Sequence, residues 1–186
     1  MPLPPPPPIE TPRLCVRPVA EADLAGLMAV NGDDLVTRHL PYATWQSMAD
    51  AQAWYQRMAG LQAAGNTLQF VIAARETGAV VGSCLLFNFN EPSARAELGY
   101  VLGRAHWRQG LAREAISALL DAAFGPMALR RIEAEVSPLN QPSLRLVHAL
   151  GFTREGLLRR RWVSKGEERD VEIHGLLRDE WPVPRR

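Results

Sequence analysis

Cysteine is scarce in this sequence, and histidine lacks the spacing of a metal site. The 186 residues include two cysteines, Cys15 and Cys84, and both lie in apolar runs, where such residues usually pack as small hydrophobic side chains. A chain of this length can bury a substantial core without a disulfide framework. The four histidines share no helical or hairpin spacing with one another or with a cysteine, so we expect no metal site.

The sequence also lacks an excess of charge of either sign and lacks a long apolar run. It carries 21 basic and 20 acidic residues, a formal net charge of +1. Such a balance produces no strong field to attract nucleic acid or an anionic membrane. No stretch approaches the roughly 20 apolar residues of a membrane helix, and the N-terminus does not have the pattern of a signal peptide. We therefore expect a protein that binds neither nucleic acid nor membrane, and the sparse cysteines favour a cytoplasmic location.

Proline, by contrast, is concentrated near the N-terminus, with five consecutive prolines at 4–8. Proline fixes φ and has no N–H, so this arm should be extended and without a core of its own. We expect a disordered arm at 1–9, a folded domain at 10–182 and a tail at 183–186. Docking to a proline-binding module is the alternative role for the arm.

The rest of the chain alternates between strand and helix patterns. Apolar residues recur at helical spacing in 21–30, 47–61, 110–124 and 140–149. Strand-like runs occupy 13–17, 68–74, 79–89, 94–102, 131–136 and two parts of 156–177. Neither a repeat nor an internal linker interrupts this order. The sequence therefore predicts a single α+β domain.

The segment 96–115 is the first that suggests a ligand. A strand-like run ends shortly before Gly110, which opens a helical pattern. A helix start presents unpaired N–H groups and the positive end of the helix dipole, which suit a phosphate. Gly110 lets a ligand approach the backbone closely, and Ala112 keeps the next turn small. The segment is neither a Walker A loop nor a dinucleotide-binding glycine motif, and an ordinary turn is the alternative reading.

A second segment makes the pattern specific to a family. Asn140-x-x-Ser143 is followed by Leu150-Gly151-Phe152. Together the two segments resemble the GNAT superfamily of N-acetyltransferases, and within it the RimJ/RimL branch. In particular, Trp107-x-x-Gly110-x-Ala112 is similar to the loop that binds the coenzyme A pyrophosphate in that branch. Two further motifs are similar to the same branch: the opening Thr11-x-Arg13-Leu14-x-x-Arg17-Pro18 and the run Glu97-Leu98-Gly99-Tyr100.

The resemblance implies a fold and a cofactor. The fold is a mixed, mostly antiparallel sheet of about seven strands with about four flanking helices, splayed between the fourth and fifth strands (94–102 and 131–136). The cofactor is acetyl-CoA, without a metal, and its pyrophosphate would lie on the backbone amides of Arg108, Gln109, Gly110, Leu111, Ala112 and Arg113. The pantetheine arm would lie between the splayed strands. There Asn140 and Ser143 would contact the pantetheine and the sulfur, and an N–H of Val101 or Leu102 would polarise the thioester carbonyl.

The implied reaction is acetyl transfer to a primary amine, with the N-terminal α-amine of a protein or peptide as our main hypothesis. The amine must lose a proton, and the departing thiolate must gain one. Glu97 is the candidate base, acting through water, and Ser143 is the candidate acid. A structural carboxylate and a hydroxyl in a first helical turn are the alternatives. Many GNAT enzymes have a tyrosine acid at the position of Val147, and one ribosomal-protein-acetylating relative has a glutamate base at that of Trp162; neither role carries over.

Acceptor recognition is expected from the early helices and the final hairpin. Tyr42, Trp45 and Trp54 are the candidate substrate-binding residues, and packing is the alternative for each. No pairing of histidine with cysteine or serine calls for a covalent intermediate, which favours direct transfer. The sequence leaves two other functions open: acetylation of a small amine (amino acid, polyamine, aminoglycoside or other antibiotic), and binding of acyl-CoA without catalysis. It is equally compatible with a monomer and a homodimer.

Overall fold

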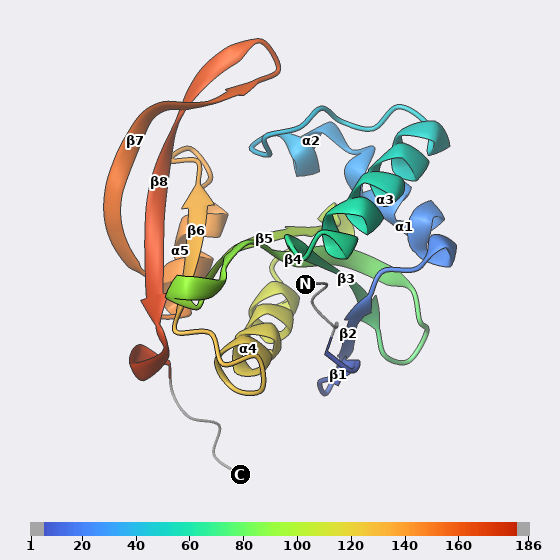
Figure 1. Cartoon of the computed structure of the whole chain (residues 1–186). Helices are drawn as coiled ribbons and strands as arrows, with labels where there is room; N and C mark the ends of the chain where they lie inside the picture. The colour runs from blue at the N-terminus through green and yellow to red at the C-terminus, as the bar shows by residue number, and fades with distance from the viewer. Residues whose placement is uncertain (1–5, 182–186) are drawn as a thin grey trace.

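The computed structural model describes residues 6–181, which form one sheet with helices on both faces (Figure 1). The sheet has eight strands in the order β1-β2-β3-β4-β5-β6-β8-β7. The strands are β1 (Ile9–Glu10), β2 (Leu14–Pro18), β3 (Thr67–Ala74), β4 (Val80–Asn90), β5 (Arg95–Leu102), β6 (Arg131–Val136), β7 (Thr153–Ser164) and β8 (Glu167–Leu177). The helices are α1 (Leu24–Asn31), α2 (Asp34–Thr37), α3 (Met48–Ala63), α4 (Leu111–Phe124) and α5 (Gln141–Ala149).

The pairing of β5 with β6 confirms the expected splay. All other neighbouring strands pair antiparallel, whereas β5 and β6 are parallel. Their pairing covers only three residues of each strand and ends at Glu97 opposite Glu133. Beyond that point the two strands diverge, so the last five residues of β5 have a strand partner on the β4 side alone. A gap in the hydrogen-bonded sheet results.

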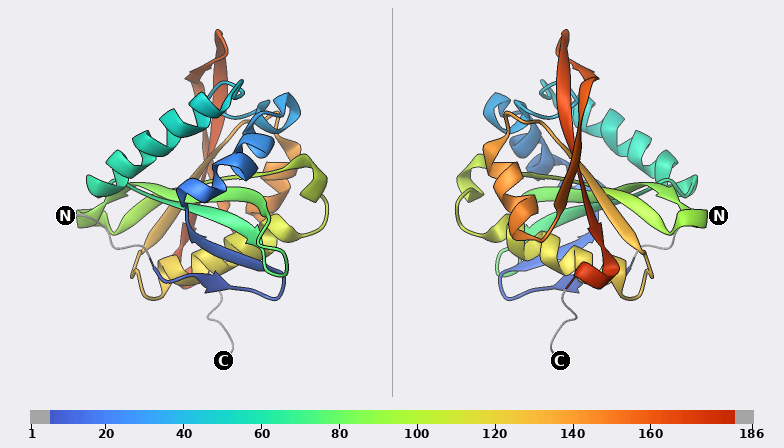
Figure 2. Two further views of the ribbon diagram at one scale, coloured as in Figure 1. Left: turned by 90° about the vertical axis from the view of Figure 1, so that its right-hand side faces the viewer. Right: turned by 90° about the vertical axis from the view of Figure 1, so that its left-hand side faces the viewer.

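The two faces of the sheet are covered by different helices, as the side views show (Figure 2). On one face α1 and α3 pack through a small cluster of Leu24, Leu27, Trp45, Ala51 and Val71. On the other face α4 and α5 join the larger core, with Ile116, Leu119, Leu120 and Val147 fully buried. Because strand side chains alternate between faces, Phe70 and Ile72 of β3 point to α4, while Val71 points to α1.

The hairpin of β7 and β8 extends beyond the sheet, and its tip meets the segment around α2 (Figure 1). Its turn uses Lys165 and Gly166, both with positive φ. The Ser164 hydroxyl donates to the Leu40 carbonyl at 3.1 Å, and the Lys165 ammonium donates to the Thr37 carbonyl at 3.1 Å. These contacts tie together two segments that are more than 120 residues apart in the chain.

The structure adds one short strand and one short α-helix to those expected. Ile9 pairs with Val16 in β1, so the last residue of the expected arm belongs to the sheet. Helix α2 is a single turn capped by Asp33, whose carboxylate accepts from the Leu35 N–H. Such short elements carry too few residues to show a period in the sequence. Residues 1–5 of the expected arm and the expected tail lie outside the described residues.

Candidate active site

The gap between β5 and β6 exposes backbone groups of β5 in alternation. The Gly103 N–H donates to the Val81 carbonyl, which makes this a hydrogen-bonded pair of the β4–β5 ladder. Such pairs alternate along antiparallel strands, so Val101 also directs its N–H to β4, whereas Leu102 and Tyr100 direct theirs to the gap. Of the two expected thioester-polarising amides, the geometry therefore favours Leu102 over Val101.

Trp107 fixes the end of this gap. Its indole Nε1 donates to the Leu102 carbonyl at 2.7 Å. The carbonyl would otherwise lie unpaired beside the gap, because β6 has moved away from it. The tryptophan of the expected pyrophosphate loop thus anchors the loop to the end of β5.

The loop that follows presents an array of free backbone amides. Arg108 and Gly110 have φ of 60° and 76°, with Gln109 between them outside the positive-φ region. Alternation of this kind turns successive N–H groups to one side and forms an anion-binding concavity. Within residues 6–181 the N–H groups of 108–113 make no hydrogen bond, and the first helical bond of α4 is from the Glu114 N–H to the Gly110 carbonyl. The N-terminus of α4 adds its positive dipole end.

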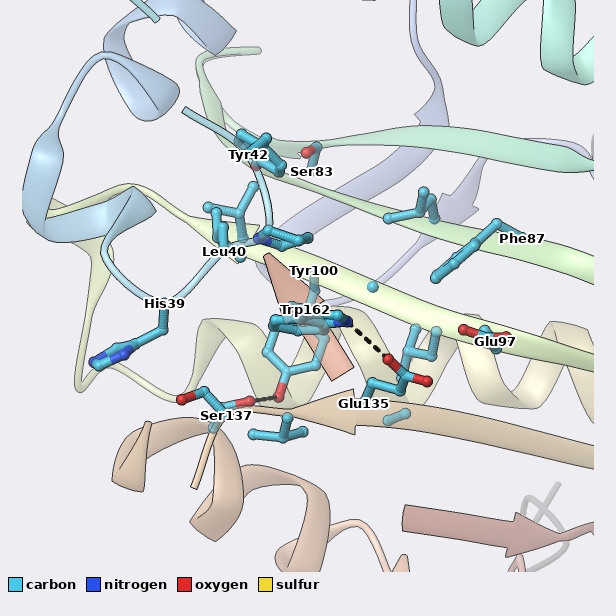
Figure 3. A pocket seen from close by; sticks show the side chains of 18 of the residues that line it. His39, Leu40, Tyr42, Ser83, Phe87, Glu97, Tyr100, Glu135, Ser137 and Trp162 are labelled. Atoms are coloured by element: carbon cyan, nitrogen blue, oxygen red, sulfur yellow. Dashed lines mark hydrogen bonds between the residues drawn. The ribbon is translucent and has the colours of Figure 1, made fainter. Parts of the chain in front are cut away.

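On the α1–α3 side of the sheet, a cavity of about 490 Å³ reaches the gap. It is lined from the sheet by Gln69, Ser83, Phe87, Glu97 and Tyr100, from β6 and β7 by Glu135, Arg161 and Trp162, and from the helical side by Tyr42 and Trp54, among others. Figure 3 shows Tyr42, Glu97, Tyr100, Glu135 and Trp162 around this space.

Only part of the expected substrate-binding set lines this cavity. Tyr42 and Trp54 do, but Trp45 does not. Trp45 is 8% exposed and packs in the cluster with Leu24 and Ala51, its ring 5.4 Å from that of Trp54. Trp45 is a packing residue, because the helical segments bury its ring behind that of Trp54. Its position agrees with the packing role that the sequence left open as the alternative for Trp45.

Glu97 is the last residue of β5 that pairs with β6, and its side chain faces the cavity (Figure 3). Its Oε1 accepts from the Asn88 amide at 3.0 Å. Burial raises the pKa of Glu97, whereas the hydrogen bond from Asn88 lowers it. The neighbouring negative charges of Glu135 and Glu133 raise the pKa further. A carboxyl group with a raised pKa is a better proton acceptor once it is ionised.

Glu135 is a second carboxylate in the cavity, and none of the sequence motifs indicated it. Its side chain accepts from the Trp162 indole at 2.8 Å, as Figure 3 shows, and from Arg161 at 3.1 Å. Glu97 and Glu133 are register partners, so Glu135 lies on the same face of the sheet two residues further along β6. The strand alternation in 131–136 was the signal that could have revealed it.

Tyr100 is the other residue that was missed. Its hydroxyl and that of Ser143, at the start of α5, lie 2.5 Å apart. Burial raises the pKa of Tyr100 to about 12, although the Ser143 hydrogen bond opposes this, so the phenol is protonated at neutral pH. Asn140 caps α5 by accepting from the Ser143 N–H at 3.2 Å, which orients the serine, and Asn140 also lines the cavity.

These features fit coenzyme A. The free amides of 108–113 suit a pyrophosphate, and the gap leads from them to the cavity. Among the residues that the structure describes, no group of three or more potential ligands could hold a metal ion.

The chain is similar to acetyltransferases in sequence and in structure. A family model described as the acetyltransferase (GNAT) domain matches residues 13–153. The uncharacterized N-acetyltransferase p20 of Bacillus licheniformis is 36% identical over 171 residues, covering 92% of this chain and 96% of its own. RimJ of Mycobacterium smegmatis, in complex with CoA-disulfide, is 28% identical with a TM-score of 0.79, covering 91% of this chain and 84% of its own.

Another solved structure has the same fold. Spermidine N-acetyltransferase of Vibrio cholerae, in complex with CoA and spermine, has a TM-score of 0.80 over 91% of this chain and 98% of its own. Its identity is 21%, so it shows the fold alone. With the matched domain, the splayed sheet and the amide array, the chain belongs to the GNAT family and is an acetyl-CoA-dependent N-acetyltransferase.

Proposed function

We propose that this enzyme transfers the acetyl group directly to the N-terminal α-amine of a protein or peptide. The observation that carries this proposal is the placement of Glu97 and the Tyr100–Ser143 pair on one cavity, at the gap between β5 and β6. The resemblance to the RimJ/RimL branch, whose members acetylate protein N-termini, supports the choice of acceptor. A cavity of about 490 Å³ has room for the first residue or two of a peptide as well as the reacting groups.

Acetyl-CoA supplies an acetyl thioester. Mainly backbone groups of this chain bind the coenzyme. The pyrophosphate is assigned to the amides of 108–113, and the pantetheine arm to the gap bordered by Asn140 and Ser143. The Leu102 N–H, which points to the gap, donates to the thioester carbonyl oxygen. Donors already aimed at a developing negative charge stabilise it without reorganisation.

One group accepts the proton from the amine, and another donates a proton to the leaving thiolate. Glu97, acting through a water molecule, accepts the proton that the ammonium must lose before it attacks. On the opposite face of β5, the hydroxyl pair of Tyr100 and Ser143 donates a proton to the departing thiolate. Because burial keeps Tyr100 protonated at neutral pH, the pair can supply that proton.

The cysteines do not support a covalent acetyl-enzyme. Cys84 is fully buried, which raises the pKa of its thiol, and Cys15 lies on β2. Within the described residues neither of them lines the cavity. A nucleophilic thiol must be both accessible and ionised, so direct attack by the amine is the simpler route.

A small cationic amine is the second candidate acceptor. Glu97 and Glu135 both line the cavity, and two carboxylates would attract a substrate with more than one positive charge. We also propose that the enzyme works in the cytoplasm, where both cysteines would stay reduced. Among residues 6–181 no helix is long and apolar enough to cross a membrane.

The test is acetyl-CoA-dependent thiol release with a panel of amines. The panel contains peptides with varied N-termini, a lysine peptide with a blocked N-terminus, free amino acids, polyamines and aminoglycosides. Wild type is compared with Glu97→Gln and with Glu91→Gln, an exposed carboxylate outside the cavity. We expect turnover on free peptide N-termini, reduced at least about tenfold in Glu97→Gln and unchanged in the control. Turnover confined to polyamines or another small amine would overturn the peptide assignment.

A further inference from the structure

The opening motif around Arg13 has no part in the reaction described above, yet it meets the coenzyme loop. The Arg13 guanidinium donates through Nη1 to the Gln109 carbonyl at 2.9 Å and through Nε to the Glu114 carboxylate at 2.6 Å. Gln109 lies in the loop before α4, and Glu114 in the first turn of α4. Arg13, which directly precedes β2, therefore connects the loop to the first turn of α4.

The contact with Gln109 determines where the next amide points. In a trans peptide the C=O and the following N–H point in opposite directions, and the described chain contains no cis peptide bond. Arg13 holds the Gln109 carbonyl on its own side, so the Gly110 N–H points away from Arg13. Gly110 stands against the guanidinium, since a Cβ built on it would lie 3.6 Å from Nη2.

Glu114 is held in turn by the N-terminal segment. One of its oxygens accepts from the Thr11 hydroxyl at 2.6 Å and from the Arg13 backbone N–H at 2.9 Å. Desolvation opposes the ionised form, but the hydrogen bonds from Thr11 and Arg13 outweigh it and lower the pKa of Glu114. The carboxylate is thus a charged, fixed anchor for the guanidinium.

We propose that Arg13, anchored by Glu114, is a positioning residue that holds the amides of 108–113 in the array that receives the coenzyme A pyrophosphate. This inference rests on the assignment of the pyrophosphate to those amides. Arg13 acts through the Gln109 peptide group and touches no reacting atom. An array assembled before binding avoids the entropy cost of ordering the loop around its ligand.

The test compares Arg13→Gln, Arg13→Lys and Glu114→Gln in the full chain, with Arg75→Gln as the matched control. Arg75 donates to the Thr11 carbonyl at 3.2 Å, whereas the hydrogen bond to the Gln109 carbonyl comes from Arg13. Two readouts are used: the Kd of coenzyme A by calorimetry, and kcat/KM with acetyl-CoA against acetyl-pantetheine, a donor that lacks the pyrophosphate.

We expect Arg13→Gln to weaken coenzyme A binding about tenfold, in line with the loss of a charge-assisted hydrogen bond. The kcat/KM for acetyl-pantetheine should stay near that of wild type. Arg13→Lys should recover only part of the loss, because an ammonium cannot make both contacts in the plane of a guanidinium. The control should bind coenzyme A as wild type does.

Glu114→Gln separates positioning from simple attraction. Removal of a negative charge near a phosphate site should strengthen binding if charge alone mattered, whereas positioning predicts weaker binding because Arg13 loses its anchor. Tighter binding in Glu114→Gln, full recovery in Arg13→Lys, or equal losses with both acetyl donors would overturn the proposal. If Arg13→Gln fails to fold, Arg13→Lys and Glu114→Gln still decide it. Calorimetry requires no acceptor, so this result is independent of which amine is acetylated.

Discussion

The hydroxyl oxygens of Tyr100 on β5 and Ser143 on α5 lie 2.5 Å apart. Tyr100 lies three residues beyond Glu97, the last residue of β5 that pairs with β6, and Ser143 lies in the first turn of α5. No other hydrogen bond between side chains of these two elements is formed among residues 6–181. The divergence of β5 and β6 lets a side chain from the sheet reach a helix start.

If this pair is the proton donor, Tyr100→Phe and Ser143→Ala should each lower kcat by about tenfold to a hundredfold. Their effects should not multiply, because both variants interrupt one proton path. Steady-state kinetics of the two single variants and the double variant measure this. Independent, multiplicative losses would show that the two hydroxyls have separate roles.

The pH dependence should report Glu97. As a base it acts only when ionised, so kcat/KM is full above its pKa and falls as the pH drops through it. Burial, followed by the charges of Glu135 and Glu133, places that pKa above its usual value. Glu135→Gln removes a negative charge and should move the acidic limb to lower pH, and Glu97→Gln should abolish the limb. A limb that stays in place in Glu97→Gln would assign it to another group.

Gly110→Ala should affect coenzyme binding more than stability. A left-handed φ of 76° costs an alanine about 1 kcal/mol, and no neighbouring atom clashes with the new Cβ. Gly78→Ala is the control, since its φ is 70° and its Cβ would meet nothing within 4 Å. Both should lower Tm similarly, but only Gly110→Ala should raise the KM for acetyl-CoA. An equal KM in both variants would argue against the loop as the pyrophosphate site.

Substitutions of the neighbouring Trp45 and Trp54 should distinguish a packing role from contact with the substrate. Trp45→Phe leaves space in a buried cluster and should lower the free energy of unfolding by about 1 to 3 kcal/mol, with little change in the acceptor KM. Trp54→Phe alters the cavity wall and should change the acceptor KM. Denaturant unfolding and acceptor titrations measure the two effects. A change in acceptor KM with Trp45→Phe at unchanged stability would contradict the assignment.

The main elements could be predicted from the sequence because their signals are local. Apolar residues at helical spacing marked α4, and Asn140 marked the start of α5, where the structure shows the cap. The motif around Gly110 indicated a helix start with free amides, and the left-handed glycine confirms it. Backbone conformation at such positions depends on a few adjacent residues, so the sequence alone was enough.

Contacts between distant segments were decided by the tertiary structure. Glu135 faces the same cavity as Glu97 because of the register between β5 and β6, and Tyr100 reaches Ser143 because those strands diverge. Trp45 and Trp54 look alike in the sequence, yet only the packing of α1 and α3 buries one and leaves the other on the cavity wall. Local patterns specify which face of an element a side chain occupies, but its neighbours across the fold depend on strand register and helix packing.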